Sequence, residues 1–158
     1  MDQNTKKQVL RMFTYGLYAV MCSDAGEVNA FTANWLSQAS FEPPLLVVSV
    51  ENASKSLPMI QHSRKFTVNV LQSGQRSLAG TLGKSALKHP EKLSEINYEM
   101  VANNTPVLKE ALGWVACEVR QTIPSGDSTL VLAEIVDAGT LNEGQSLTMN
   151  EAGFRHAG

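Results

Sequence analysis

The chain has 158 residues, of which 43% are hydrophobic and 18% charged, and this length suits one domain (1–158) with a substantial core. Its 13 basic and 15 acidic side chains leave a net charge of −2, which argues against nucleic acid as the main partner. No apolar run approaches the ~20 residues of a membrane span, no signal peptide is evident, and Cys22 and Cys117 lack a CxxC partner, so we expect a reduced, cytoplasmic protein without membrane contact.

The N-terminal third predicts a short helix followed by a hairpin. Asn4 or Thr5 can cap a helix that continues to Phe13. Residues 17–22 have the pattern of a strand, and residues 27–31 are expected to pair back after a glycine-containing turn.

Residues 31–44 mix aromatic and polar side chains, and they lead into the apolar run 45–50. This run indicates a strand buried on both faces, and Pro43-Pro44 marks its entry because proline has no backbone donor. We expect the segment before it to be a loop in which donors such as Asn34 lie beside Trp35. Such a loop suits a flat ring with hydrogen-bonding edges, although a surface loop around a packed Trp also fits the composition.

The remainder of the chain predicts further strands and two short helices. Residues 83–106 show no period, so we expect mostly loop there. A count of about six strands against two or three helices favours an antiparallel barrel or sandwich. The expected elements are a helix at 57–62, a strand at 65–71, a helix capped by Ser73, and two strands at 113–122 and 128–138 around a turn at 124–127.

The sequence lacks the motifs that mark several common classes of enzyme and binding site. Gly83-Lys84-Ser85 matches the end of a P-loop, but Leu78 stands where the first glycine is required. His62, His89 and His156 have no ligand at metal spacing, so no metal site is predicted. The sequence has no Gly-x-Ser-x-Gly elbow and no dinucleotide fingerprint. A hydrolase or a ligand-binding barrel without flavin therefore remains only as an alternative, and NAD(P)H would bind transiently.

The ordered set of motifs is similar to one known family. It comprises Thr32-Ala33-Asn34-Trp35, Ser40, Pro43-Pro44 with its strand, Asn69-Val70-Leu71 with Gln75, and Gly126-Asp127. Together they resemble the flavin-reductase-like, FMN-binding split-barrel family over most of the chain. The resemblance implies a mostly β fold, an antiparallel Greek-key barrel with a few short helices, and a homodimer with FMN near the interface. The N-terminal part also resembles the subgroup linked to A-type flavoproteins and rubredoxin electron transfer, which implies a redox protein as a possible partner.

The resemblance also assigns site residues. Thr32, Ala33, Asn34 and Trp35 would line the isoalloxazine ring with support from Ser40, and Glu51, Asn52, Lys55 and Ser56 would hold the ribityl and phosphate groups. Lys55 supplies a charge, and Ser54 and Ser56 at a helix start can bind an anion, although a plain capped helix explains them too. With one compact phosphate site and no second anion-binding loop, we expect FMN rather than FAD.

Ser128 is a departure from the family pattern, because many members carry a histidine there that is thought to meet the nicotinamide. A hydroxyl cannot stack or carry charge, which weighs against efficient NAD(P)H oxidation. The expected function is a flavin-reductase-type oxidoreductase that passes electrons from NAD(P)H or a reduced protein donor to an acceptor, without a protein nucleophile. The alternative is an FMN-binding electron carrier with little NAD(P)H turnover. Phe154 and Arg155 beside His156 can fold over the flavin or a partner subunit.

Overall fold

The computed structural model describes the backbone of residues 1–158 and every side chain except that of Ala102. Strands dominate, and the helices are short. The elements in chain order are α1 (Gln3–Leu10), β1 (Tyr18–Asp24), β2 (Glu27–Ala33), β3 (Leu36–Ser40), β4 (Leu45–Glu51), α2 (Ser56–Ser63), β5 (Lys65–Val70), α3 (Arg76–Leu82), β6 (Tyr98–Val101), the 3-10 helix Ala102–Asn104, β7 (Thr105–Leu108), β8 (Gly113–Ser125), β9 (Ser128–Thr140) and α4 (Met149–Ala152).

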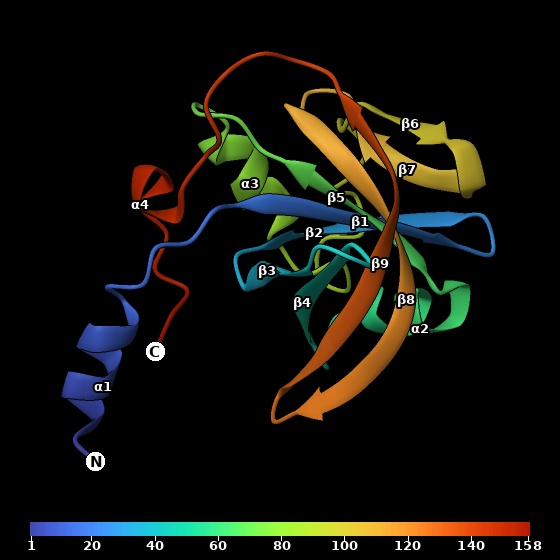
Figure 1. Cartoon of the computed structure of the whole chain (residues 1–158). Coiled ribbons are helices and arrows are strands. Elements are labelled where there is room, and N and C mark those ends of the chain that lie inside the picture. Colours follow the sequence, from blue (N-terminus) through green and yellow to red (C-terminus); the bar gives the residue numbers. More distant parts are fainter.

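The main sheet closes on itself at one corner. Its seven strands have the order β2-β1-β5-β8-β9-β4-β3, and every neighbouring pair is antiparallel. The edge strands β2 and β3 are joined by Asn34 and Trp35 alone, a connection that spans at most about 10 Å. The two edges must therefore meet, and the sheet curls into a barrel (Figure 1). A hydrogen bond of 3.0 Å from the Ser49 amide to the Trp35 carbonyl secures the corner.

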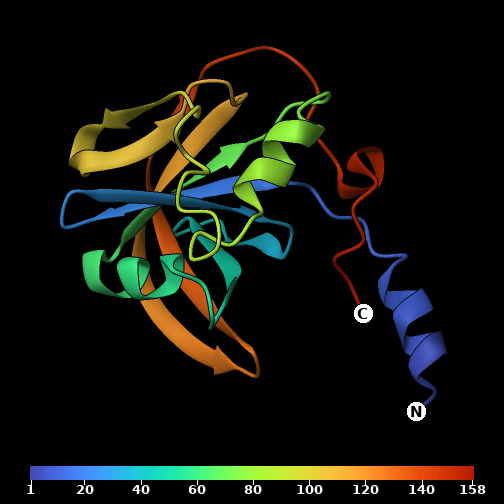
Figure 2. The same ribbon diagram turned by 180° about the vertical axis from the view of Figure 1, so that it is seen from behind.

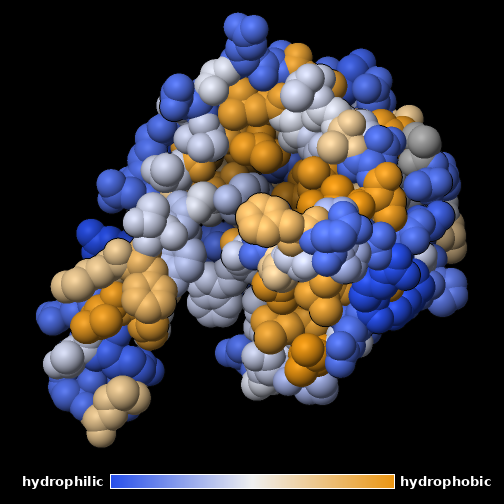
Figure 3. Space-filling model, in the orientation of Figure 1, coloured by the Kyte–Doolittle hydropathy of each residue, from blue (hydrophilic) through white to orange (hydrophobic). Residues whose placement is uncertain are grey.

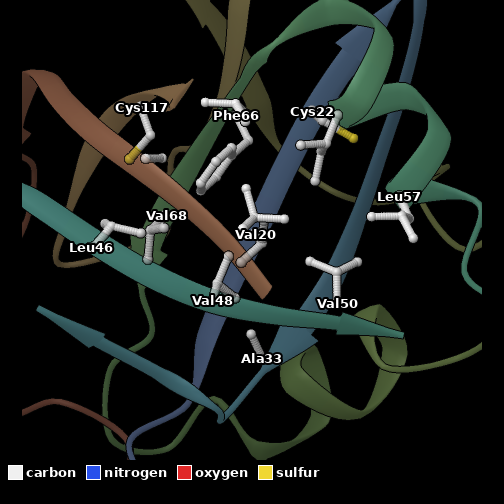
Figure 4. Packing of buried hydrophobic residues seen from close by; sticks show 14 of the residues in the cluster. Val20, Cys22, Ala33, Leu46, Val48, Val50, Leu57, Phe66, Val68 and Cys117 are labelled. Carbon is white, nitrogen blue, oxygen red and sulfur yellow. The ribbon is translucent and has the colours of Figure 1, made fainter. Parts of the chain in front are cut away.

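The barrel interior is filled by one apolar cluster. Val20 of β1, Val48 and Val50 of β4 and Phe66 of β5 are fully buried and point toward one another from different walls (Figure 4). Helix α2 covers this cluster with Leu57, Met59 and Ile60. These inward-facing apolar residues, contributed by different strands of one curled sheet, form the core of the barrel.

A second cluster lies outside the barrel, against the outer face of β1. There Ala19 and Met21 pack with residues of α3, β7 and α4, including Leu82, Leu108 and Met149. Strand β1 is therefore buried on both faces, whereas β4 alternates between buried and half-buried positions. The prediction that 45–50 is buried on both faces was wrong, because no layer covers that side of β4 as α3 and α4 cover β1.

Other expectations need correction. Residues 36–40 form β3 rather than a loop, and residues 98–108 contain the β6–β7 hairpin that lacked a visible period. Asp2, not Asn4 or Thr5, caps α1, which ends at Leu10 before the predicted Phe13. Ser73 does not cap α3: its hydroxyl donates to Glu151 at 2.7 Å.

Helix α1 projects from the body of the molecule, as the view from behind also shows (Figure 2). It buries no side chain, and Val9 and Phe13 in and after it are 48% and 56% exposed. Among the described residues, no helix is both long and apolar enough to cross a membrane.

Candidate functional site: a cavity at the closing corner of the barrel

A cavity of about 450 Å³, here called the main cavity, opens beside the Asn34–Trp35 corner. Its walls come from β2, the corner itself, the end of β4, the start of α2, the loop after α3, the start of β9 and the C-terminal segment. They comprise Asn29, Phe31, Thr32, Ala33, Asn34, Trp35, Ser49, Glu51, Ala53, Ser54, Lys55, Ser56, Gly83, Lys84, Ser85, Ala86, Leu87, Lys88, Lys92, Ser128 and His156. This size is within the range of small-molecule and cofactor sites.

The corner presents one aromatic face and two polar groups that are already engaged. Trp35 is 40% exposed, whereas Asn34 is 8% exposed. The Asn34 amide donates to the His156 carbonyl at 2.9 Å and contacts the Met149 sulfur at 3.2 Å. The Thr32 hydroxyl donates to the Ala79 carbonyl at 2.6 Å. These two side chains therefore fix the corner against α3 and the C-terminal segment, and the Trp35 ring is left exposed to a ligand.

The wall around the start of α2 combines a cation with buried hydroxyl groups. Lys55 forms an ion pair with Glu27 of β2. Ser56 is fully buried and accepts a hydrogen bond from Asn29 at 2.8 Å, while Ser54 accepts from the Leu57 amide at 3.2 Å. This wall has the charge and donors that an anionic group requires, with Lys55 shared between the site and Glu27.

The loop after α3 forms a second cationic wall that the sequence interpretation missed. Residues 83–88 line the cavity and carry Lys84 and Lys88. Lys92, 7% exposed, braces this loop by donating to the carbonyls of Leu82 and Lys84, each at 2.8 Å. Burial lowers the pKa of Lys92 to about 8. The expectation that the chain has no second anion-binding loop stays a prediction, although the Gly83-Lys84-Ser85 motif, assessed only as a P-loop, brings a lysine to this wall.

Two predicted site residues lie away from the main cavity. Ser40 ends β3 opposite Leu45. The Asn52 amide donates to the Gly126 carbonyl at 3.1 Å and accepts from the Thr129 hydroxyl at 2.8 Å. Asn52 thus clamps the β8–β9 turn to the end of β4.

Ser128, at the start of β9, and His156, in the C-terminal segment, both line the cavity. Ser128, the predicted nicotinamide contact, is 4% exposed and its hydroxyl donates to Asp127 at 3.2 Å. His156 lies against Trp35, with ring centroids 5.3 Å apart. Within the described side chains, no group of three or more His, Cys, Asp or Glu side chains could hold a metal ion.

The donor set fits a flat, phosphorylated ring compound. Trp35 and Phe31 offer apolar surface, and Lys55, Lys84 and Lys88 offer positive charge. Thr32, Ala33, Asn34, Trp35, Glu51, Lys55 and Ser56, all predicted from sequence, are brought to this one cavity from three chain segments. The fold and the cavity together define a β-barrel protein with a cofactor-sized site at its closing corner.

The chain belongs to the flavin reductase like domain family, whose model matches residues 10–158. It is similar to a flavin reductase of Pseudomonas putida, with 25% identity over 154 residues that cover 97% of this chain and 89% of that protein. It is also similar to the high molecular weight rubredoxin of Moorella thermoacetica, with 27% identity over 143 residues. That match covers 89% of this chain and 62% of the rubredoxin, so the chain spans less than two thirds of that relative.

The solved structures agree on the fold. The flavin reductase PheA2 in its native state superposes with a TM-score of 0.80 at 28% identity, covering 94% of this chain and 93% of that chain. The predicted mostly β, antiparallel split barrel is thereby confirmed, as is membership of a flavin-binding oxidoreductase family.

Proposed function

We propose that this protein binds FMN in the main cavity and acts as a flavin reductase, taking electrons from NAD(P)H and passing them to an acceptor. The observation that supports this most is the convergence of the predicted site residues on one cofactor-sized cavity at the barrel corner. Bound flavin supplies the redox chemistry, which is why the side chains need only bind, orient and exclude water.

Each wall has a distinct task in this proposal. Trp35 and the backbone of Thr32 and Ala33 would hold the ring, while Asn34 fixes their positions through its bonds to the C-terminal segment. Lys55 and the amides at the start of α2 would hold the phosphate. Lys84 and Lys88 add positive charge beyond that of Lys55, and FAD has a second phosphate that such charge could hold. A comparison of FMN and FAD affinities therefore tests the proposal.

An electron carrier with little NAD(P)H turnover is the second candidate. Two observations favour it: the Ser128 hydroxyl is hydrogen-bonded to Asp127, and one relative is a high molecular weight rubredoxin. In this case the donor or acceptor would be a redox protein.

Anaerobic stopped-flow mixing of the FMN-loaded protein with NADH or NADPH separates the two candidates. A flavin reductase will bleach the 450 nm flavin band (about that wavelength for oxidised flavin) in a single saturable phase. An electron carrier will be bleached only by a reduced protein donor such as rubredoxin. Failure of both donors would contradict both candidates.

We also propose that the protein is a homodimer. A groove of the barrel surface, here called the apolar groove, includes Tyr18, Leu36, Trp114 and Ile135. Tyr18, Leu36 and Ile135 pack on the inner core cluster, so the core reaches the surface at this groove. Figure 3 shows hydrophobic side chains on the exposed face of the barrel and on α1. A second copy that covers such a surface removes apolar area from water.

A further inference from the structure

We infer that His156 forms the wall on which the nicotinamide of the hydride donor rests, the role for which sequence had singled out Ser128. This inference depends on the proposed flavin reductase function. It concerns a residue about 28 positions away from Ser128 along the chain, carried back to the site by the fold.

The C-terminal segment, residues 153–158, is directed to the cavity by a defined turn. Thr148 caps α4, and Gly153 ends it with a positive φ of 73°, which a residue with a side chain adopts at a cost. Arg76 of α3 donates to the Ala152 carbonyl, and its guanidinium lies 5.2 Å from the centroid of the Phe154 ring. These contacts fix the start of the segment against α3.

The far part of the segment is fixed by Asn34. This buried amide donates to the backbone carbonyl of His156 at 2.9 Å, so the position of the residue does not depend on its own ring. The imidazole is then free to contact a ligand: 59% of the side chain is exposed, and it packs on Trp35 at an interplanar angle of 42°. Its Nε2 lies 3.9 Å from Oε1 of Glu51.

His156 also stands where two cavities adjoin. A second cavity of about 320 Å³, here called the side cavity, lies between the barrel corner and α3. Phe154 and Met149 line the side cavity but not the main cavity. The residues shared by the two cavities are Thr32, Asn34, Glu51, Gly83, Lys84 and His156. A donor that must touch the flavin needs a site next to the main cavity, and the side cavity lies next to it because the two have lining residues in common.

In this proposal His156 positions the nicotinamide ring and takes no part in bond making or breaking. In the hydride-transfer step a C–H bond of the dihydronicotinamide ring would break and its hydride, one proton with two electrons, would form a new bond to the bound flavin, which would leave the nicotinamide as the oxidised cation and the flavin reduced by two electrons. His156 neither gains nor loses a proton in this step. Its planar ring would limit the orientations of the nicotinamide, and such restriction raises the rate of transfer.

Three variants separate this role from others. His156→Ala removes the ring, His156→Phe keeps a planar group against Trp35, and Arg155→Ala is the matched control, since Arg155 is exposed and does not line the main cavity. In the apoprotein with Trp114→Phe, which leaves Trp35 as the single tryptophan, His156→Ala should change the Trp35 emission and Arg155→Ala should not.

Binding is measured next, without turnover. We expect FMN affinity to stay within about twofold in all three variants. NAD⁺ binding to the protein loaded with FMN and reduced by dithionite, followed by charge-transfer absorbance, should weaken at least about fivefold in His156→Ala and less than about threefold in His156→Phe. In single-turnover reduction by NADH, the concentration for half-maximal rate should rise by the same factors.

Three results would overturn the inference. Unchanged NAD⁺ binding in His156→Ala would show that the ring has no contact with the donor. Equal weakening of FMN and NAD⁺ would show that the segment is only structural. Tighter FMN binding in His156→Ala would show that the ring competes with the cofactor. If the wild type itself binds no FMN or is not reduced by NAD(P)H, the proposed function fails first, so the two failures are distinguishable.

Discussion

Most polar side chains at the corner already have a hydrogen-bond partner within the protein, and this limits the hydrogen bonds that each can form with a ligand. Asn34 and Thr32 hold the C-terminal segment and α3, and Ser56 accepts from Asn29. Sequence motifs identified these residues as important but could not distinguish ligand contacts from supports, because their partners lie between 27 and 122 positions away in the chain. Lys55 is the clearest candidate for direct contact, since it is a charge with one exposed partner.

Replacing Lys55 with Ala should weaken FMN binding by about 1–2 kcal/mol, the scale of one charge-assisted contact. Riboflavin, which lacks the phosphate, should bind almost as well as to the wild type. Glu27→Gln is the matched control: it releases Lys55 from its ion pair and should leave FMN binding unchanged or slightly stronger. Both affinities can be measured by quenching of flavin fluorescence. Equal losses for the two ligands would assign Lys55 a structural role.

The two buried thiols, Cys22 and Cys117, should make the stability of the fold depend on pH. Burial raises the pKa of Cys22 to about 11 and that of Cys117 to about 12, from an ordinary value of 9.0. Both raised pKa values mean that the folded state keeps protons that the unfolded state loses, so their stabilising contribution is complete below pH 9 and is lost as the pH rises through about 11 for Cys22 and about 12 for Cys117. Urea unfolding at pH 8 and pH 10.5 (values on either side of about 9) should show a smaller loss of stability in a Cys22→Ala, Cys117→Ala variant than in the wild type. An equal loss would mean that the thiols titrate normally.

At the scale of elements, a regular pattern of apolar residues predicted strands correctly. The lack of such a pattern did not predict loops correctly. Strands β1, β5, β8 and β9 were expected because inward apolar residues alternate or run together along them. Strand β3 was missed because it lies at a sheet edge with Ser37, Gln38 and Ala39 exposed, and the β6–β7 hairpin because it pairs with itself outside the main sheet. The loop 83–88 and the segment 153–158 lack any period, so only the tertiary fold places them at the site.

One buried amide helps to hold the β6–β7 hairpin against β5, beside the Thr67 hydroxyl, which donates to the Pro106 carbonyl. Asn69 of β5 is fully buried, donates to the Ala19 carbonyl and the Thr67 hydroxyl at 3.0 Å each, and accepts from the Leu108 amide at 2.8 Å. Asn69→Ala should therefore lower the free energy of unfolding by about 2 kcal/mol or more, because buried groups lose their partners. The exposed Asn150→Ala serves as the control and should change stability by less than about 0.5 kcal/mol in chemical denaturation. A loss in Asn69→Ala no larger than that of the control would contradict this role.

At the scale of the whole molecule, the exposed α1 and the apolar groove predict self-association. Sedimentation equilibrium should give a mass of about 34 kDa, twice the 17.1 kDa of one chain. Ile135→Asp in the groove should shift the mass toward the monomer, whereas Val136→Asp, on the neighbouring position of β9, should not, since Val136 does not line the groove. A wild-type mass of about 17 kDa at all concentrations would contradict the homodimer.

The family of the chain follows from the match over residues 10–158. The central proposal, that the main cavity binds FMN, is tested by a direct binding measurement. Titration of FMN with the protein, followed by quenching of flavin fluorescence, tests it most directly. We predict saturation at one FMN per chain. Ala86→Trp fills the loop side of the main cavity and should weaken FMN binding at least about tenfold. Ser94→Trp, at an exposed position further along the same loop, should leave FMN affinity unchanged. The absence of saturable quenching, or equal affinity in Ala86→Trp and the wild type, would contradict the assignment of the main cavity as the flavin site.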